Sequence, residues 1–237
     1  MTSGGGRFGL AAGAVLYGGV DLLWPAAGGW LRLLAAVELA GGVALLWPRG
    51  QTAPRAGAAA LTAVYLIVTA ITLPDIVRHP AVFNSWGNAG EELARLAGAA
   101  LLLAMLWPAA RRLAKPACWA FAVCVLSFAL EQWVYFAPTV ALVPAWLPPG
   151  RVFWAIATTL AFGLAAAALL SGRMALIAAR LLTAMLVGFG LLVWVPILIQ
   201  HSHVLGNWTE FAETLSIAGA AWVVSDHRAV ATGRAGR

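Results

Sequence analysis

Two stretches of the sequence carry histidine, tryptophan and glutamate in the same order and at the same spacing. They are PDIVRHPAVFNSWGNAGEE at residues 74–92 and PILIQHSHVLGNWTEFAET at residues 196–214. In each, a proline closes an apolar run, and a histidine follows five residues later, with a tryptophan seven and a glutamate twelve residues after the histidine. Histidine and glutamate exchange protons and bind metals, so these two stretches are the first candidates for chemistry.

Two kinds of chemistry fit these residues. In the first, His201, His203 and His79, with Glu213, supply imidazole and carboxylate ligands for zinc, iron or copper. In the second, Glu38, Glu131 and Glu213 form a pocket in which carboxylates exchange protons with a quinone headgroup. An ionisable group inside an apolar segment is costly and is a functional candidate by default. Of the two we expect the proton-handling pocket, with quinone as its cofactor, rather than a metal site.

A structural explanation of the acids also stands. Glu91 and Glu92 precede Arg95 by four and three residues, so either carboxylate can pair with the guanidinium on one helix face. Acids are also favoured at helix starts. The residues expected around the pocket are Glu38, Glu91, Arg95, Glu131, Trp208 and Glu213.

The elements that position these residues are apolar. Of the 237 residues, 62% are hydrophobic and 10% charged, whereas soluble domains are nearer ~45–50% apolar. Apolar runs of membrane-spanning length recur, and each should be a helix because lipid cannot satisfy backbone amides. The fold expected is all-α, a membrane bundle of eight transmembrane helices at 8–24, 30–47, 56–73, 89–107, 117–137, 152–171, 174–199 and 209–225.

Basic residues set the orientation. If both termini are cytoplasmic, ten of the fifteen basic residues lie at inner helix ends or in the tail, as the positive-inside rule requires. The net charge of +6 then reflects topology and contact with the lipid bilayer, and no nucleic-acid partner is expected. Asp226 is the one acid placed in the inner half, so the acids and most histidines should gather toward the outer side.

An internal repeat underlies the twin stretches. A shift of 122 residues aligns Pro74 with Pro196, His79 with His201 and Glu91 with Glu213. The chain therefore divides into a four-helix repeat at 1–112 and a second at 113–237. Each repeat crosses the membrane an even number of times, so the two insert the same way up about an axis along the membrane normal.

The second repeat resembles the DoxX-like membrane proteins. The resemblance covers residues 117–226 and rests on motifs in a fixed order: Val143-Pro144-x-Trp146-x-Pro148, Phe153-Trp154, Asn207-Trp208-x-x-Phe211 and Ala218-Gly219-Ala220-Ala221-Trp222. Relatives commonly have a Glu-His pair before the first motif, whereas this chain has Glu131 followed by Gln132. The resemblance implies an accessory subunit that helps a redox partner protein reach the quinone pool, without stand-alone enzyme activity, in a bacterial inner membrane.

Two other functions remain open on the sequence. A carrier for a small molecule or ion would need polar groups that continue toward the inner face. A membrane scaffold or assembly protein without chemistry would need its acids only to be paired or hydrated.

Overall fold

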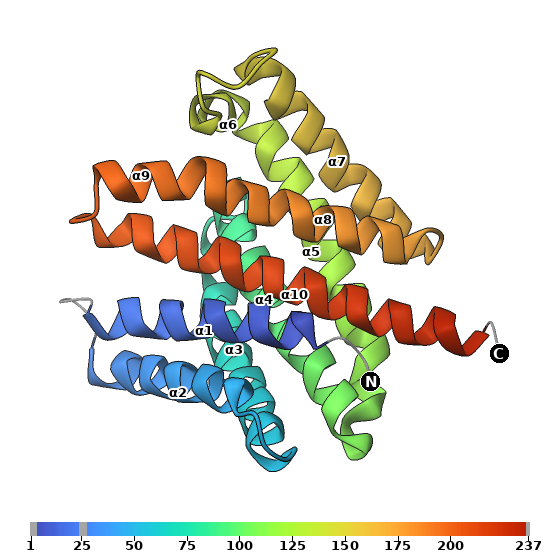
Figure 1. Ribbon diagram of the computed structural model, residues 1–237. Coiled ribbons are helices and arrows are strands. Elements are labelled where there is room, and N and C mark those ends of the chain that lie inside the picture. Colours follow the sequence, from blue (N-terminus) through green and yellow to red (C-terminus); the bar gives the residue numbers. More distant parts are fainter. Residues whose placement is uncertain (1–3, 24–27, 236–237) are drawn as a thin grey trace.

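The computed structural model describes residues 4–23 and 28–235, and within these ranges the backbone is helical, without strands (Figure 1). Trp24, which ends the first predicted run, and Arg237, used in the orientation argument, lie outside the described residues. The helical elements are α1 (Gly5–Leu23), α2 (Gly29–Leu46), α3 (Thr52–Arg78), α4 (Phe83–Leu106), a 3₁₀ turn (Pro108–Leu113), α5 (Ala114–Val134), α6 (Phe136–Leu142), α7 (Arg151–Ser171), α8 (Ala175–Phe189), a π-helical segment (Gly190–Trp194), α9 (Val195–Gln200) and α10 (Leu205–Ala235).

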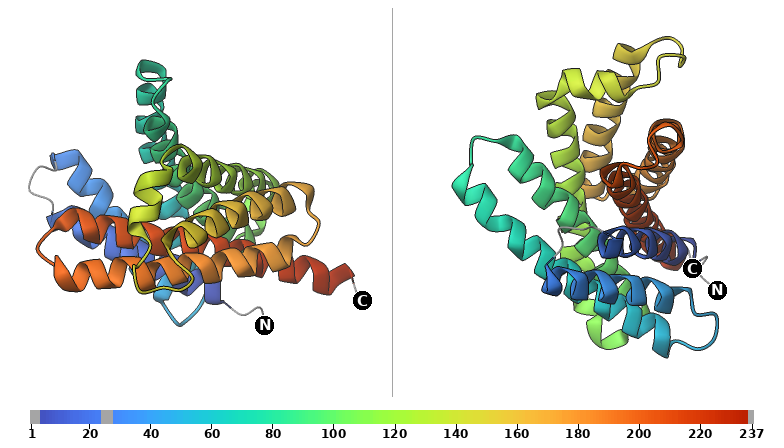
Figure 2. Two further views of the ribbon diagram at one scale, coloured as in Figure 1. Left: turned by 90° about the horizontal axis from the view of Figure 1, so that it is seen from above. Right: turned by 90° about the vertical axis from the view of Figure 1, so that its left-hand side faces the viewer.

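Consecutive long helices pack in pairs, and the pairs cross at the centre of the molecule. The pairs are α1 with α2, α3 with α4, α5 with α7, and the α8–α9 stretch with α10. The α3–α4 and α5–α7 pairs run across the direction shared by α1, α8 and α10, so the tips of the α3–α4, α5–α7 and α9–α10 pairs point in different directions (Figure 2). The first and last long helices, α1 and α10, lie side by side and close the bundle.

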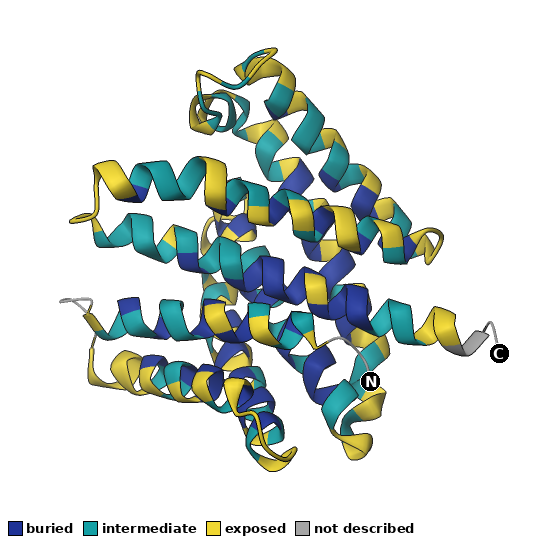
Figure 3. Cartoon of the chain, in the orientation of Figure 1, coloured by how far each residue is buried: buried dark blue, intermediate teal, exposed yellow. Residues whose placement is uncertain are grey.

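The most continuously buried positions lie on α4 and on the middle of α10 (Figure 3). On α4 the helices α3, α5 and α10 cover the surface, and on α10 the covering helices are α1, α4 and α8. These two central helices also carry ionisable side chains, including Glu92, Arg95, Glu213 and Asp226. The charged segments are therefore placed inside and are covered by more apolar ones.

The covering helices expose large apolar side chains. Five helical stretches in the described part of the chain are long and apolar enough to cross a membrane: Gly29–Leu46, Thr52–Arg78, Pro108–Val134, Arg151–Ser171 and Ala175–Gln200. Between 22% and 39% of each apolar window is buried, and side chains such as Leu33, Leu164 and Leu181 are mostly exposed. Soluble monomers rarely expose so much contiguous apolar surface, so this is the arrangement of a helical membrane bundle.

The prediction of an all-α membrane bundle is thus confirmed for the described residues. The third apolar run, however, was expected to end before Pro74, whereas Pro74 lies inside α3 and the helix continues to Arg78. Pro196 likewise lies in α9, directly after the π-helical segment. Local widening of the helix accommodates a missing backbone donor, so proline here does not end the helix. The short α6 had no counterpart in the prediction.

Glycine allows α1 and α10 to touch through their backbones. A Cβ on Gly219 would lie 2.6 Å from Leu10 Cα, and a Cβ on Gly6 would lie 2.5 Å from Val223 N. Such distances are far below van der Waals contact, and a backbone atom cannot rotate away. Small residues that permit close helix approach are a main source of packing energy in lipid.

Gly219→Ala should therefore lower the stability of the folded chain by about 1–3 kcal/mol, because the added methyl group overpacks the α1–α10 contact. The measurement is the thermal unfolding midpoint of the purified protein in mild detergent. Gly163→Ala is the matched control, since Gly163 on α7 has nothing within 4 Å of its Cβ position. Equal midpoints for the two variants would contradict the close backbone approach.

Candidate functional site

Arg95 lies on α4 at the point where five helices meet, and only 1% of the residue is exposed. The polar side chains around it come from different helices: Tyr17 of α1, Glu38 of α2, Tyr65 of α3, Glu92 of α4 and Glu213 of α10. We refer to these five residues and Arg95 as the Arg95 cluster. A buried guanidinium requires compensating partners, and here they come from most of the bundle.

The guanidinium faces three carboxylates. Its Nη2 donates a hydrogen bond to Oε1 of Glu92, one helical turn earlier on α4. Its Nη1 lies 3.7 Å from Oε1 of Glu38, and its Nε lies 3.8 Å from Oε1 of Glu213. The last two distances are too long for hydrogen bonds, and neither Nη1 nor Nε has a hydrogen-bond partner among the described residues. Glu38 and Glu213 therefore interact with Arg95 through charge alone.

Two tyrosine rings complete the surroundings of the guanidinium. Arg95 Cζ lies 4.0 Å from the centre of the Tyr17 ring and 5.0 Å from that of Tyr65. A cation over an aromatic face is stabilised by the ring quadrupole. The Tyr65 hydroxyl donates a hydrogen bond of 2.8 Å to Oε1 of Glu38. Tyr65 thus contacts both the cation and one of its counter-charges.

The charges of the Arg95 cluster do not balance. One guanidinium faces the carboxyl groups of Glu38, Glu92 and Glu213, and Asp21 on α1 also interacts electrostatically with Arg95. Uncompensated charge in a low-dielectric interior is strongly unfavourable. The surplus must be neutralised by protons or by a bound cation, and a proton needs no additional space.

A second group of acids borders the Arg95 cluster. Glu91 on α4 lies within electrostatic range of Glu131, Glu210 and Glu213. The Glu131 carboxylate packs against Gly87, where a Cβ would lie 2.6 Å from Oε1. Glu131 therefore lies on the α4–α5 contact, and among the described residues Arg95 has its ion pairs with Glu38, Glu92 and Glu213 instead.

Gln132 follows Glu131 near the end of α5. Its Oε1 accepts hydrogen bonds from the hydroxyls of Thr158 at 3.2 Å and Thr159 at 3.0 Å, both on α7. In this chain the position links α5 to α7 through an amide oxygen.

The structure does not bring the three candidate metal-ligating histidines together. His79 pairs with Asp75 at 3.8 Å near the tip of the α3–α4 pair, whereas the rings of His201 and His203 lie 6.4 Å apart before α10. These two tips are separate in both views of Figure 2. In the described ranges, no three His, Cys, Asp or Glu residues are placed to hold a metal ion.

Trp208 has a local role that the sequence did not indicate. Its indole N–H donates to the Ser202 carbonyl at 2.9 Å. Trp86 makes the same bond to Pro80 at 3.1 Å, and Trp154 to Pro148 at 2.8 Å. In each case a tryptophan near the start of a helix donates to the backbone carbonyl six residues earlier, in the connection that precedes the helix. Such a bond satisfies the indole N–H at the interface.

Of the residues expected around a pocket, the structure brings Glu38, Arg95 and Glu213 into one cluster and places Glu91 beside it. The pairing of Arg95 with Glu92 is confirmed. Tyr17 and Tyr65 were missed. The sequence contained one signal for them: the chain has only three tyrosines, and these two lie inside apolar runs, where a polar hydroxyl needs a partner.

Comparisons with known proteins give no relative for this chain: no family model, no curated protein and no solved structure matches it. The function is therefore argued from the cluster and the fold themselves.

Replacing Arg95 by glutamine should destabilise the protein severely, by about 3–5 kcal/mol, because the buried carboxylates lose the one cation that pairs with them in the described part of the chain. The check is the yield of monodisperse protein and its unfolding midpoint in detergent. Arg180→Gln is the control, since Arg180 is an exposed arginine on α8, which packs against α10. Wild-type stability in the Arg95 variant would mean that the carboxylates do not depend on the guanidinium.

Proposed function

We propose that this chain is an inner-membrane protein with eight spanning helices, built as parallel repeats at 1–112 and 113–237 with both termini cytoplasmic. The three helices that complete the five apolar ones are α1, α4 and α10, whose polar residues face the interior of the bundle. Basic residues at the ends of α2 and α7 and in the 3₁₀ turn support the orientation.

The repeat has support in the backbone. The His79 amide donates to the Asp75 carbonyl at 2.8 Å, and the His201 amide donates to the Ile197 carbonyl at the same distance. The next bond is duplicated as well, from Val82 to His79 at 3.0 Å and from Val204 to His201 at 3.1 Å. Both pairs are related by the 122-residue shift of the sequence repeat.

The packing order of the helices fits the same two-fold relation. The first helix of the first half, α1, packs against the last helix of the second half, α10, and the first helix of the second half, α5, packs against the last of the first half, α4. The central contact between α4 and α10 joins the two equivalent helices.

For the role of the protein, we propose a DoxX-like accessory subunit of a quinone-linked redox system, in which the Arg95 cluster binds and releases protons. The observation that carries this proposal is the charge imbalance: one buried guanidinium faces the carboxyl groups of Glu38, Glu92 and Glu213. Protons are the simplest counter-charge for such a site. A quinone takes up two protons with its two electrons when it is reduced to quinol, so a proton-binding centre inside the membrane matches that chemistry.

A carrier fits the packing less well. Between Glu213 and Asp226, the buried side chains of α10 are mainly apolar, among them Ile217, Ala221 and Val224. This interval of 13 residues is about 20 Å long on a helix. A polar path from the cluster to the inner end is therefore interrupted.

The proposal predicts a protonated carboxyl group in the cluster at neutral pH. Infrared spectroscopy of the purified protein should detect its C=O stretch, and the band should shrink in Glu213→Gln and in Glu38→Gln. Asp75→Asn is the control, because Asp75 is a half-exposed carboxylate that pairs with His79 near the tip of the α3–α4 pair and does not pair with Arg95. Quinone co-purifying with the wild type is measured in the same preparations.

An absent band, or a band lost equally in the Asp75 variant, would refute the proton-binding role. A band without any bound quinone would keep the proton site and remove the quinone-linked role. If both readouts are absent while the folded protein is abundant, a scaffold function without chemistry is the better description.

The proposed orientation predicts which loops are accessible. Ser202→Cys, in the exposed connection before α10, should react with a membrane-impermeant maleimide in intact cells. Ser171→Cys, at the exposed end of α7, should react only after permeabilisation. The unmodified chain is the background control, since its cysteines, Cys118 and Cys124, are buried. Reversed labelling would place the termini outside.

A further inference from the structure

A cavity of about 610 Å³ lies at the inner end of the bundle, away from the Arg95 cluster. It is bounded by the starts of α1 and α5, the end of α4, the 3₁₀ turn and the last third of α10. Ten residues separate Arg7 from Tyr17, and ten separate Met105 from Arg95, about 15 Å along a helix. The cavity is therefore a second, independent site.

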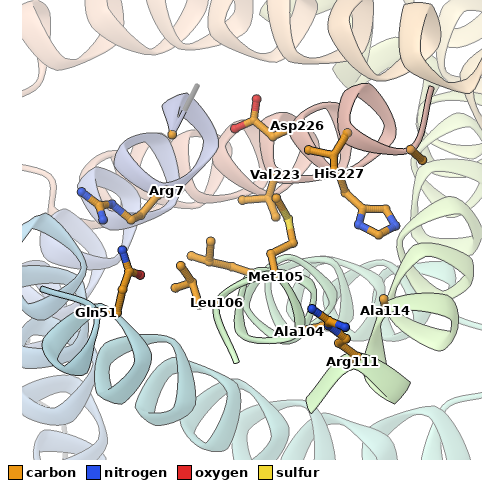
Figure 4. Close-up of a pocket in the computed structure, with 14 residues that line it drawn as sticks. Arg7, Gln51, Ala104, Met105, Leu106, Arg111, Ala114, Val223, Asp226 and His227 are labelled. Carbon is orange, nitrogen blue, oxygen red and sulfur yellow. The ribbon is translucent and has the colours of Figure 1, made fainter. Parts of the chain in front are cut away.

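Two arginines line this cavity from different elements. Figure 4 shows Arg7 with Gln51 on one side, and Arg111 with His227 on the other. Asp226 is the one acidic lining residue, and its Oδ2 already accepts a hydrogen bond of 3.0 Å from the Gly6 amide. The formal charge of the lining is thus positive even with His227 neutral, and an anion is the ligand that it favours.

One helix start beside the cavity acts in the same direction. Gly4 and Arg7 lie at the start of α1, so the positive end of this helix dipole borders the space. The end of α4 contributes a negative helix terminus. There the Leu106 carbonyl accepts a hydrogen bond of 2.9 Å from Arg55 Nε. The positive charge of Arg55 therefore offsets the negative end of the α4 dipole.

The remaining lining is hydrocarbon. Leu102, Met105, Leu106, Val223 and Val230 contribute apolar side chains to the same cavity. Met105 and Leu106 lie between the two basic sides in Figure 4. A small hydrated anion would leave these surfaces without a partner, whereas an amphiphile would contact both the arginines and the apolar wall.

From this arrangement we infer that this cavity binds an anionic amphiphile that carries phosphate, with Arg7 on one side and Arg111 on the other as its basic contacts. Arginine matches phosphate oxygens with two parallel N–H donors. Basic pockets between membrane helices on the cytoplasmic side are suited to acidic lipid headgroups. The inference does not depend on the proton-binding role proposed for the Arg95 cluster.

The experiment measures ligand-induced stabilisation of the full-length protein in mild detergent. The probes are phosphatidylglycerol, phosphatidylcholine and inorganic phosphate, each titrated against the unfolding midpoint. Phosphatidylglycerol should raise the midpoint with saturation. Arg7→Gln and Arg111→Gln should each weaken its apparent affinity about tenfold, as expected for loss of one charge-assisted contact.

Arg112→Gln is the matched control, because Arg112 is the exposed neighbour of Arg111 on the same 3₁₀ turn and does not line the cavity. It should bind phosphatidylglycerol like the wild type. If Arg7→Gln folds poorly, Arg111→Gln, at an exposed position, still tests the site. Retention of the lipid in native mass spectrometry gives a second readout that does not require thermal unfolding.

The arms of the titration separate the possible sources of phosphate. Saturation with phosphatidylglycerol, without a comparable effect of inorganic phosphate, supports the inference and assigns the site to a lipid headgroup. An equal effect of inorganic phosphate would show that the apolar wall contributes nothing to binding and would overturn the amphiphile as ligand. Equal stabilisation by phosphatidylcholine would mean that any lipid stabilises the protein, and equal weakening in the Arg112 variant would mean that surface charge in general is responsible. Either result would overturn the inference.

Discussion

The arrangement of the bundle depends on the compensation of one buried positive charge. Arg95 is held on α4 by carboxylates from α2, α4 and α10 and by aromatic rings from α1 and α3. Because five helices each provide a partner, none of them can shift far without exposing the guanidinium to an apolar environment. The same interactions explain why α4 and α10, although rich in charge, occupy the centre and leave the lipid-facing positions to apolar helices.

The two polar regions of the molecule have opposite character. Around Arg95 the acids outnumber the cation, whereas the inner cavity is lined by two arginines against Asp226. Apolar packing on α10 separates them. Each region therefore has its own electrostatic requirement, for a counter-cation around Arg95 and for a counter-anion in the cavity between α1, α4 and α10, and the two can be altered independently.

The helices could be predicted from the sequence because each apolar run is long and the backbone has no alternative in lipid. The pairing of Arg95 with Glu92 followed from their spacing on one helix. The tyrosines were missed because their role depends on which faces of α1 and α3 meet α4. The histidines failed to gather because the α3–α4 and α9–α10 pairs diverge. Their crossing involves close glycine contacts such as that of Gly98 on α4 with Ala220 on α10, which no spacing rule identifies.

The contact between α1 and α10 has a consequence for biogenesis. α1 obtains its principal neighbour only when α10 has been synthesised, so α1 has an incomplete set of contacts while the helices between them are translated. Arg95 is in a similar position until Glu213 arrives. The bundle can therefore assemble fully only after α10 has been synthesised. Truncation that removes α10 also removes the helix that packs against both α1 and α4.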